Sequence, residues 1–191
     1  MMLLKEYLVA DLKRLHYLSG KNDLSITRMS LVKACLGPRF MPVAIFRFAH
    51  VLFCNGWPGL AKFFSFLNFF MFGLEVAPQI PIGPGLFFPH TQGTVIGARS
   101  IGSNATIFQQ VTVGASKLDM AFDMMLRPTI GDNVVLGSGA KILGGIFIGN
   151  DVTVGANSVV VSNIPNCVTC AGIPARVITK HQLTEAETVH A

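Results

Sequence analysis

An aliphatic residue that returns at every sixth position constrains the fold of this chain more than any other feature. The series is interrupted once, and its nine members are all Ile, Leu or Val: Ile101, Ile107, Val113, Ile130, Leu136, Ile142, Ile148, Val154 and Val160. Three short strands joined by tight turns close a triangular coil of roughly eighteen residues, so that each corner recurs every six. The sequence therefore predicts a mainly β fold, a parallel β-helix with the aliphatic residues inside its prism.

The predicted corners have their own residue types. Glycine directly follows the aliphatic residue in six of the nine hexads, and Asn104, Asn133 and Asn157 lie at further corner positions. Gly and Asn both accept a backbone conformation that other residues resist. Because a single coil cannot bury its own faces, each coil depends on its neighbours and the two ends need caps. We expect the N-terminal segment and residues 177–191 to provide these caps.

Two irregularities interrupt the period. Ile96 and Ile101 lie five positions apart, which shifts the register by one residue near Ala98. Val113 and Ile130 lie seventeen positions apart, where an unbroken pattern would separate them by six. The sequence therefore predicts a loop over residues 116–129 that is extruded from the prism.

The residues before position 75 follow a different pattern. Their apolar side chains recur with helical spacing, and Gly, Pro and Asn residues separate one apolar segment from the next. The sequence predicts helices over 3–18, from about 25–30 to 37, over 43–54 and over 59–72. The chain then divides into a helical N-terminal region (1–74), a β-helix (75–178) and a C-terminal tail (179–191).

Composition and charge exclude several classes of protein. The net charge is +5, but the 15 basic residues are scattered, which argues against a nucleic-acid partner. Only 13% of the residues are charged, yet the two long uncharged stretches, 76–98 and 152–175, are broken by Pro and Asn, whereas a membrane span needs roughly 20 predominantly apolar residues. The N-terminus lacks a signal-peptide cleavage site and four cysteines are too few for a disulfide scaffold. These features predict a cytoplasmic protein with reduced cysteines.

Phenylalanine is concentrated between residues 63 and 72. The six phenylalanines in this segment are more than one buried helix face requires, so that apolar side chains cover more than one face. We expect contacts between copies of the chain to bury them. The alternative is a peripheral contact with the inner face of a membrane, with Lys62 at its edge, which would suit an acceptor carried on a lipid.

Three segments carry motifs beyond the six-residue repeat. Residues 82–93 read IGPGLFFPHTQG, residues 111–117 read VTVGASK and residues 171–176 read AGIPAR. They resemble, in that order, the segment with the active-site histidine, the acetyl-CoA loop and the closing motif of the serine acetyltransferase-like branch of the left-handed β-helix acyltransferases, in particular its polysaccharide-modifying members. The resemblance covers most of the chain and is strongest over 75–178. It implies a left-handed prism and a homotrimer with an active site in each cleft between adjacent prisms.

The resemblance also implies roles for single residues. His90 would be the general base, with acetyl-CoA as the acetyl donor and no metal ion. The acidic partner of the histidine, fifteen residues before it, falls on Glu75, where the family more often has Asp. The residues expected to bind acetyl-CoA are Gly114, Ala115, Ser116, Ser138, Ala156 and Arg176.

The chemistry of these residue types agrees with that reading. Attack of a hydroxyl on a thioester requires removal of the hydroxyl proton, and a neutral imidazole, with an ordinary pKa of about 6.5, can do this near neutral pH. A carboxylate behind the ring would fix its tautomer and stabilise the imidazolium. Backbone N–H groups at the break after Val113, especially those of Gly114 and Ala115, are candidate donors to the oxyanion.

The acceptor is less clearly indicated than the donor. Leu126 and Arg127 stand where serine acetyltransferases carry an Arg-His pair, of which the Arg grips the serine carboxylate. Adjacent side chains in an extended segment point to opposite faces, so Arg127 is not a simple substitute. The loop is also longer and apolar, which suits the face of a sugar ring, with Arg127, Gln92, Asp119 and Asp123 as candidate contacts. We therefore predict acetyl transfer to a sugar or polysaccharide precursor, with L-serine, in cysteine biosynthesis, as the alternative.

Two readings from other classes of function are weaker. A non-catalytic β-helix scaffold would have no need of the extruded loop or of His90. A metal-dependent β-helix hydratase would need several histidines in its coils, and residues 75–178 contain only His90. An O-acetyltransferase is therefore the leading prediction.

Overall fold

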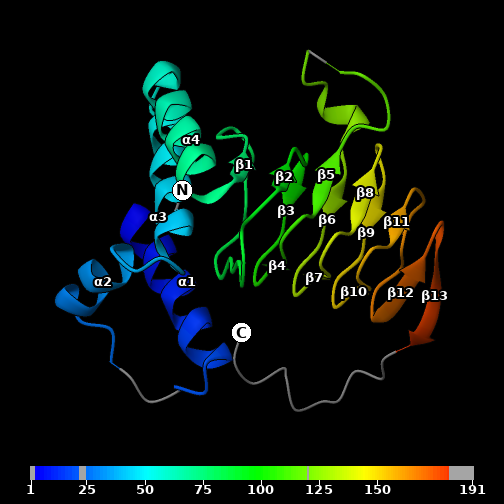
Figure 1. The fold of residues 1–191 in the computed structure, drawn as a ribbon, viewed down its shortest axis with the longest axis horizontal. Coiled ribbons are helices and arrows are strands. Elements are labelled where there is room, and N and C mark those ends of the chain that lie inside the picture. Colours follow the sequence, from blue (N-terminus) through cyan, green and yellow to red (C-terminus); the bar gives the residue numbers. More distant parts are fainter. Residues whose placement is uncertain (1–2, 22–24, 120, 181–191) are drawn as a thin grey trace.

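The computed structural model describes residues 3–21, 25–119 and 121–180. Its N-terminal part is helical, and the prediction of four helices is confirmed with shifts of a few residues at their ends (Figure 1). The helices are α1 (Leu4–Leu18), α2 (Arg28–Cys35), α3 (Met41–Cys54) and α4 (Pro58–Phe72). No helix in these described ranges is both long enough and apolar enough to cross a lipid bilayer.

Local sequence signals set the helix ends. Thr27 caps α2, because its side chain accepts a hydrogen bond from the Ser30 backbone N–H at 3.1 Å while the Ser30 hydroxyl accepts one from the Thr27 N–H at 2.9 Å. Proline occupies the first turn of both α3 and α4, where its missing N–H costs no hydrogen bond. Gly73 ends α4 with a φ of 61°, the left-handed conformation that glycine adopts without steric cost.

The rest of the described chain is a triangular parallel β-helix, as the six-residue period predicts. One face is the sheet β1-β2-β5-β8-β11, a second is β4-β7-β10-β12-β13, and the third is β3-β6-β9. All pairings are parallel except that of β12 with β13. The strands are β1 (Leu74–Val76), β2 (Thr94–Ile96), β3 (Ser100–Ile101), β4 (Thr106–Ile107), β5 (Thr112–Gly114), β6 (Thr129–Ile130), β7 (Val135–Leu136), β8 (Lys141–Leu143), β9 (Phe147–Ile148), β10 (Thr153–Val154), β11 (Val159–Val160), β12 (Val168–Gly172) and β13 (Ala175–Lys180).

The interior of the prism is the aliphatic series itself. All nine residues of the series are at most 3% exposed and belong to one hydrophobic core that runs the length of the prism. Asn104, Asn133 and Asn157 have φ angles of 58°, 55° and 55°, which confirms the prediction that asparagine occupies left-handed corner positions. Burial of the stacked aliphatic side chains therefore holds the coils together, and the asparagines allow the chain to turn between them.

Both ends of the prism are covered. The antiparallel hairpin of β12 and β13 closes the C-terminal end, and the tail residues 181–191, which we also expected to act as a cap, lie outside the described residues. At the other end the helical region packs on the first coil, because Val43 and Phe46 of α3 belong to the same hydrophobic core as Leu74 and Ile80.

A buried ion pair joins the helical region to the first coil. The Arg47 Nε lies 2.8 Å from Asp11 Oδ2, and the two side chains are 1% and 0% exposed. Asp11 Oδ1 accepts hydrogen bonds from the backbone N–H groups of Gly85 and Leu86 at 2.8 Å, while Arg47 donates to the carbonyl oxygens of residues 82 and 83 at 2.6 Å. Burial raises the pKa of Asp11, and the hydrogen bonds from Arg47 and the two N–H groups oppose that rise. The pair thereby fixes the turn that leads into the segment with His90.

Candidate active site

His90 lies at a corner of the first coil that is longer than the same corner in the coils below. Phe87 of the first coil pairs with Thr106 of the second, and Val95 pairs with Thr112. Eight positions therefore separate Phe87 from Val95 in the first coil, whereas six separate Thr106 from Thr112 in the second. The two extra residues lie between the buried Phe88 and Thr94, where the chain bulges outward. The exposed His90 side chain is part of this bulge. The local insertion thus presents the imidazole at the surface.

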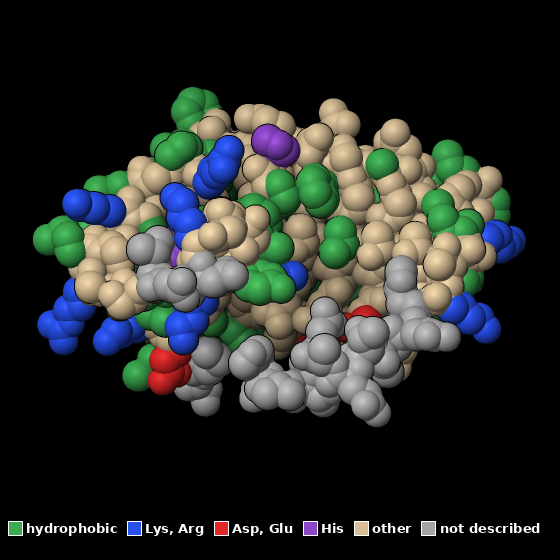
Figure 2. All heavy atoms as spheres, turned by 90° about the horizontal axis from the view of Figure 1, so that it is seen from below, with side chains coloured by type: hydrophobic (Ala, Val, Ile, Leu, Met, Phe, Trp, Pro, Cys, Tyr) green, Lys and Arg blue, Asp and Glu red, His purple; other side chains and the backbone are tan. Residues whose placement is uncertain are grey.

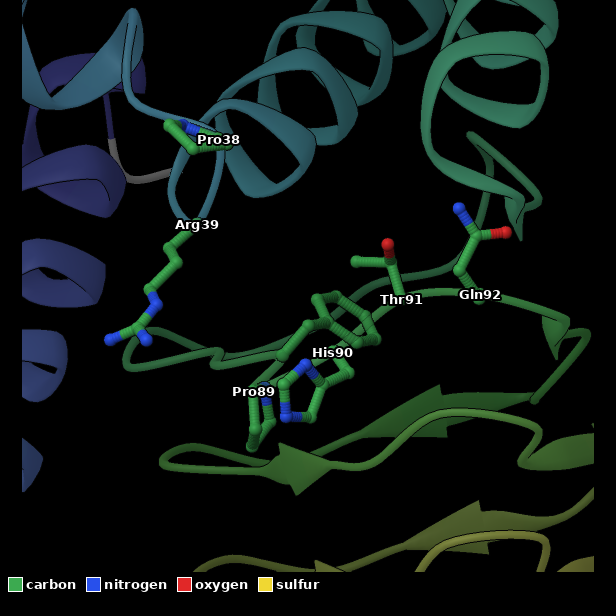
Figure 3. A pocket seen from close by; sticks show the side chains of 7 residues that line it. Pro38, Arg39, Pro89, His90, Thr91 and Gln92 are labelled. Carbon is green, nitrogen blue, oxygen red and sulfur yellow. The ribbon is translucent and has the colours of Figure 1, made fainter.

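A hollow of about 200 Å³ lies beside His90 (Figure 3). One wall is the bulge itself, and the other comes from the turn before α3. The hollow is lined by Pro38, Arg39, Phe88, Pro89, His90, Thr91 and Gln92. Gln92, a predicted substrate contact, lines the hollow together with His90, and so does Arg39, which the sequence did not indicate. Arg39 lies in a turn between helices and belongs to no repeat or motif, so no sequence signal marks it.

The corner that carries His90 continues down one edge of the prism. The Gln92 carbonyl oxygen accepts a hydrogen bond from the Gln110 N–H at 3.0 Å, that of Gln109 from Gly139 at 2.9 Å, and that of Ser138 from Asn157 at 2.8 Å. Ser138 and Ala156, which precede Gly139 and Asn157, therefore lie on the same edge as His90, in successive coils. Two of the predicted acetyl-CoA contacts thus share an edge with the predicted base.

The other predicted donor residues lie on a different edge. Gly114 ends β5, and Ala115 and Ser116 begin the extruded loop, at the far side of the sheet β1-β2-β5-β8-β11 from the His90 corner. A side chain added at Gly114 would meet no atom within 4 Å, so the backbone here faces open space. Strands of three residues separate the two edges by roughly 10 Å. A single prism therefore does not place His90 and Gly114 in one cleft.

Glu75 occupies the outer face of that sheet. It lies in the middle of β1, in register with Val95 of β2, and its side chain is exposed. Within the described part of the chain, the side chains of Glu75 and His90 have no hydrogen-bond or ion-pair partner. The proposed carboxylate–imidazole pair is therefore not formed within this chain, and the role of Glu75 stays a prediction.

The extruded loop stands out from the prism beyond β5 (Figure 1). Its conformation is held by the side chain of Arg127. Arg127 is 9% exposed, and its guanidinium carbon lies 3.5 Å from the centre of the Phe122 ring. Its Nη2 donates to Asp119 Oδ2 at 2.7 Å and its Nη1 donates to the Gly97 carbonyl oxygen at 3.0 Å. A hydrogen bond from the Asp123 N–H and the nearby Arg127 lower the pKa of Asp119. Arg127 and Asp119 therefore hold the loop and leave little of either side chain free for an acceptor.

The remaining predicted site residues lie apart from the hollow. Asp123 accepts a hydrogen bond from the Met125 N–H at 2.9 Å and so begins the short 3₁₀ helix Met124–Leu126. Arg176 lies on β13 at the far end of the prism from His90, exposed, with its Nη1 donating to the Ala175 carbonyl oxygen. Among the described residues, no three His, Cys, Asp or Glu side chains gather as metal ligands.

Comparison with known proteins places this arrangement in a family. Residues 127–162 match the family described as bacterial transferase hexapeptide (six repeats). The serine acetyltransferase of Helicobacter pylori strain J99 is 40% identical over 146 residues, which are 76% of this chain and 84% of that protein. The chain belongs to the serine acetyltransferase family. Membership confirms the prediction of an O-acetyltransferase and the left-handed β-helix that the resemblance implies.

Solved serine acetyltransferase structures have the same fold. The Neisseria gonorrhoeae enzyme superimposes with a TM-score of 0.79 at 32% identity, covering 96% of this chain and 67% of the other. A serine acetyltransferase in complex with CoA superimposes with a TM-score of 0.78 at 28% identity, covering 92% and 69%. The Neisseria gonorrhoeae enzyme in complex with serine gives 0.74 at 33% identity, covering 91% and 68%. The likeness therefore includes the helical region as well as the prism.

The comparisons do not support the polysaccharide-modifying branch that the sequence analysis favoured. Curated relatives of this chain are named serine acetyltransferases, among them the Staphylococcus epidermidis enzyme at 41% identity over 68% of this chain and 60% of that protein. The departure of the loop from the serine acetyltransferase pattern, at Leu126 and Arg127, led us to the sugar acceptor. The similarity of the remaining chain outweighs that local difference.

Proposed function

We propose that this chain transfers the acetyl group of acetyl-CoA to the hydroxyl of L-serine. The observation that supports this most strongly is 40% identity to a serine acetyltransferase over 84% of that protein's length. Related structures hold CoA in one case and serine in another. The exposed His90 beside a hollow of about 200 Å³ gives such an acceptor a place next to a general base.

In this proposal each part of the chain has a defined task. His90 removes the proton from the acceptor hydroxyl, and the hydroxyl oxygen attacks the thioester carbonyl. When the tetrahedral intermediate collapses, the C–S bond breaks and the imidazolium of His90 returns the proton to the departing CoA thiolate. Backbone N–H groups at Gly114 and Ala115 donate to the oxyanion of that intermediate. Open space at Gly114 and the small side chains of Ser138 and Ala156 leave room for the pantetheine arm. That Glu75 orients the imidazole stays a prediction, because the two side chains are not paired within one chain.

A carbohydrate hydroxyl is the second candidate acceptor. It is favoured by one observation, the extruded loop, in which Arg127 is bound to Asp119 and the neighbouring Leu126 is 43% exposed. A cation held in this way is poorly placed to pair with the carboxylate of a free amino acid. The apolar loop surface would instead suit the face of a sugar ring.

Release of free CoA thiol from acetyl-CoA tests the two acceptors directly. The enzyme should consume acetyl-CoA with L-serine at a rate at least tenfold above that with nucleotide sugars, with O-acetylserine identified by mass spectrometry. D-serine and L-alanine serve as matched controls, because the first reverses the stereochemistry and the second lacks the hydroxyl. A higher rate with a nucleotide sugar than with L-serine would restore the carbohydrate reading.

We also propose a homotrimer. His90 and Gly114 lie on different edges of one prism, so a cleft between two prisms could bring the base of one chain to the donor site of the next. Exposed aromatic side chains of α4, namely Phe63, Phe66, Phe69 and Phe70, are between 52% and 77% exposed and would be buried by such contacts. Sedimentation equilibrium should give three times the chain mass of 20.6 kDa at micromolar concentration. A stable monomer that retains full activity would contradict both the trimer and the shared cleft.

A further inference from the structure

We infer that Arg39 recognises an anionic group on the acceptor and so determines which hydroxyl His90 can serve. This inference rests on the proposed O-acetyl transfer at His90 and adds the chemical class of the acceptor. Arg39 lies in the turn between α2 and α3, far from His90 in the sequence, and lines the same hollow (Figure 3). An acceptor in the hollow therefore lies between a candidate base and a cation.

The guanidinium of Arg39 is available for a ligand. Its side chain is exposed, and within the described ranges it has no hydrogen-bond or ion-pair partner. Arg47 and Arg127 differ in this respect, because Arg47 is bound to Asp11 and Arg127 is bound to Asp119. A planar guanidinium pairs with a carboxylate or a phosphate through two parallel hydrogen bonds. Arg39 is thus the arginine at the hollow that has this capacity unused.

The distribution of charge favours an anion at this end of the molecule. Residues 1–72 contain nine Lys or Arg and three Asp or Glu, a net charge of +6, whereas residues 73–191 contain six and seven, a net charge of −1. Figure 2 shows Lys and Arg side chains gathered over the helical end of the chain. Because the hollow lies where that region meets the first coil, its field attracts negatively charged molecules.

The inference also agrees with the state of the extruded loop. Arg127, the arginine of that loop, is bound to Asp119 and is poorly placed to pair with a second carboxylate. Arg39, on the wall of the hollow that faces the bulge, can pair with the carboxylate of an acceptor that lies there. A hollow of about 200 Å³ is below the range of about 300–1,000 Å³ typical of sites for drug-sized ligands, so it suits a small acceptor or one anionic end of a larger one.

Steady-state kinetics test the inference by comparing the unaltered enzyme with Arg39→Gln and Arg39→Lys. Arg28→Gln is the control, because Arg28 is also an exposed arginine but does not line the hollow. We expect Arg39→Gln to raise the KM for L-serine about 10- to 100-fold, the worth of a charge-assisted hydrogen bond, with kcat changed less than threefold. Arg39→Lys should recover part of the loss. The unaltered enzyme should prefer L-serine to L-serinamide, and Arg39→Gln should lose that preference.

Comparison of the acceptors distinguishes a failure of this inference from a failure of the proposed function. If the enzyme acetylates L-serine but Arg39→Gln leaves its KM unchanged, or raises only the KM for acetyl-CoA, the inference is wrong and the function stands. If L-serine is not acetylated but a nucleotide sugar is, with a KM that rises in Arg39→Gln, the inference stands with phosphate as the anion. If the unaltered enzyme and Arg39→Gln acetylate an uncharged sugar at equal rates, the inference and the proposed function are both overturned.

Discussion

Replacing His90 with alanine is expected to lower kcat at least 100-fold while the KM for acetyl-CoA stays within a factor of three. General base catalysis contributes about 10²–10⁴-fold, and His90 is the histidine that lies on the hollow. The side chain is exposed on a bulge between coils, so its removal should leave the aliphatic core, and with it the fold, intact. Thiol release under saturating acetyl-CoA, with CoA binding measured by calorimetry, checks both parts of the expectation.

His16→Ala is the matched control for this substitution. His16 lies near the end of α1, does not line the hollow, and should leave kcat unchanged. Glu75→Gln should cost less than His90→Ala, because the carboxylate would act through the ring. A rate in His90→Ala equal to that of the unaltered enzyme would remove His90 from the mechanism. A larger loss in Glu75→Gln than in His90→Ala would mean that Glu75 does more than orient the imidazole.

The prism could be predicted from the sequence because its physics is periodic. Each interior position repeats the same burial, so one aliphatic series specifies the core, and the φ angles at Asn104, Asn133 and Asn157 follow from the same repeat. The helical segments carry an equally local signal in their spacing and in the residues that end them. A turn or a helix end that depends on a residue within it could therefore be predicted from the sequence.

The junction of helices and prism could not be predicted in this way. Asp11 and Arg47 lie 36 positions apart, and Asp11 binds backbone groups 74 and 75 positions away. Asp11 lies in an amphipathic helix in which a polar residue is ordinarily exposed, so no local pattern indicates that it is buried. Arg39 could not be predicted for the same reason. It lines the hollow beside His90, and these two residues lie about fifty positions apart in the sequence.

The candidate site was predicted in its residue types more fully than in its geometry. The resemblance predicted His90 as the base and the positions for the donor, but it could not show that Arg127 folds back onto Asp119 and Phe122. The loop contains no sequence repeat, and which of its side chains bind one another depends on the conformation that it adopts. It also bears on the acceptor, because a cation bound within the loop leaves the recognition of an anion to another residue.

The second large effect is expected at the buried ion pair, where Arg47→Met should destabilise the protein by about 3–5 kcal/mol. Removing one partner of a buried pair leaves the other charge uncompensated, here Asp11 at 0% exposure. For a chain of this length each kcal/mol corresponds to about 2–4 °C, so the midpoint of thermal unfolding should fall by about 6–20 °C. Calorimetry at fixed protein concentration measures it, with Lys13→Met, an exposed position two residues beyond Asp11, as the control.

The same variant should also lose activity below its unfolding temperature. Arg47 holds the carbonyl oxygens of residues 82 and 83, and through Asp11 the N–H groups of Gly85 and Leu86, five and four residues before His90. Release of that turn lets the bulge move relative to the hollow, and a small displacement of a base from its acceptor is costly for catalysis. Asp11→Asn keeps an oxygen for the two N–H groups and should retain more activity than Arg47→Met. Equal stability and equal kcat in Arg47→Met and Lys13→Met would show that the ion pair fixes neither the junction nor the base.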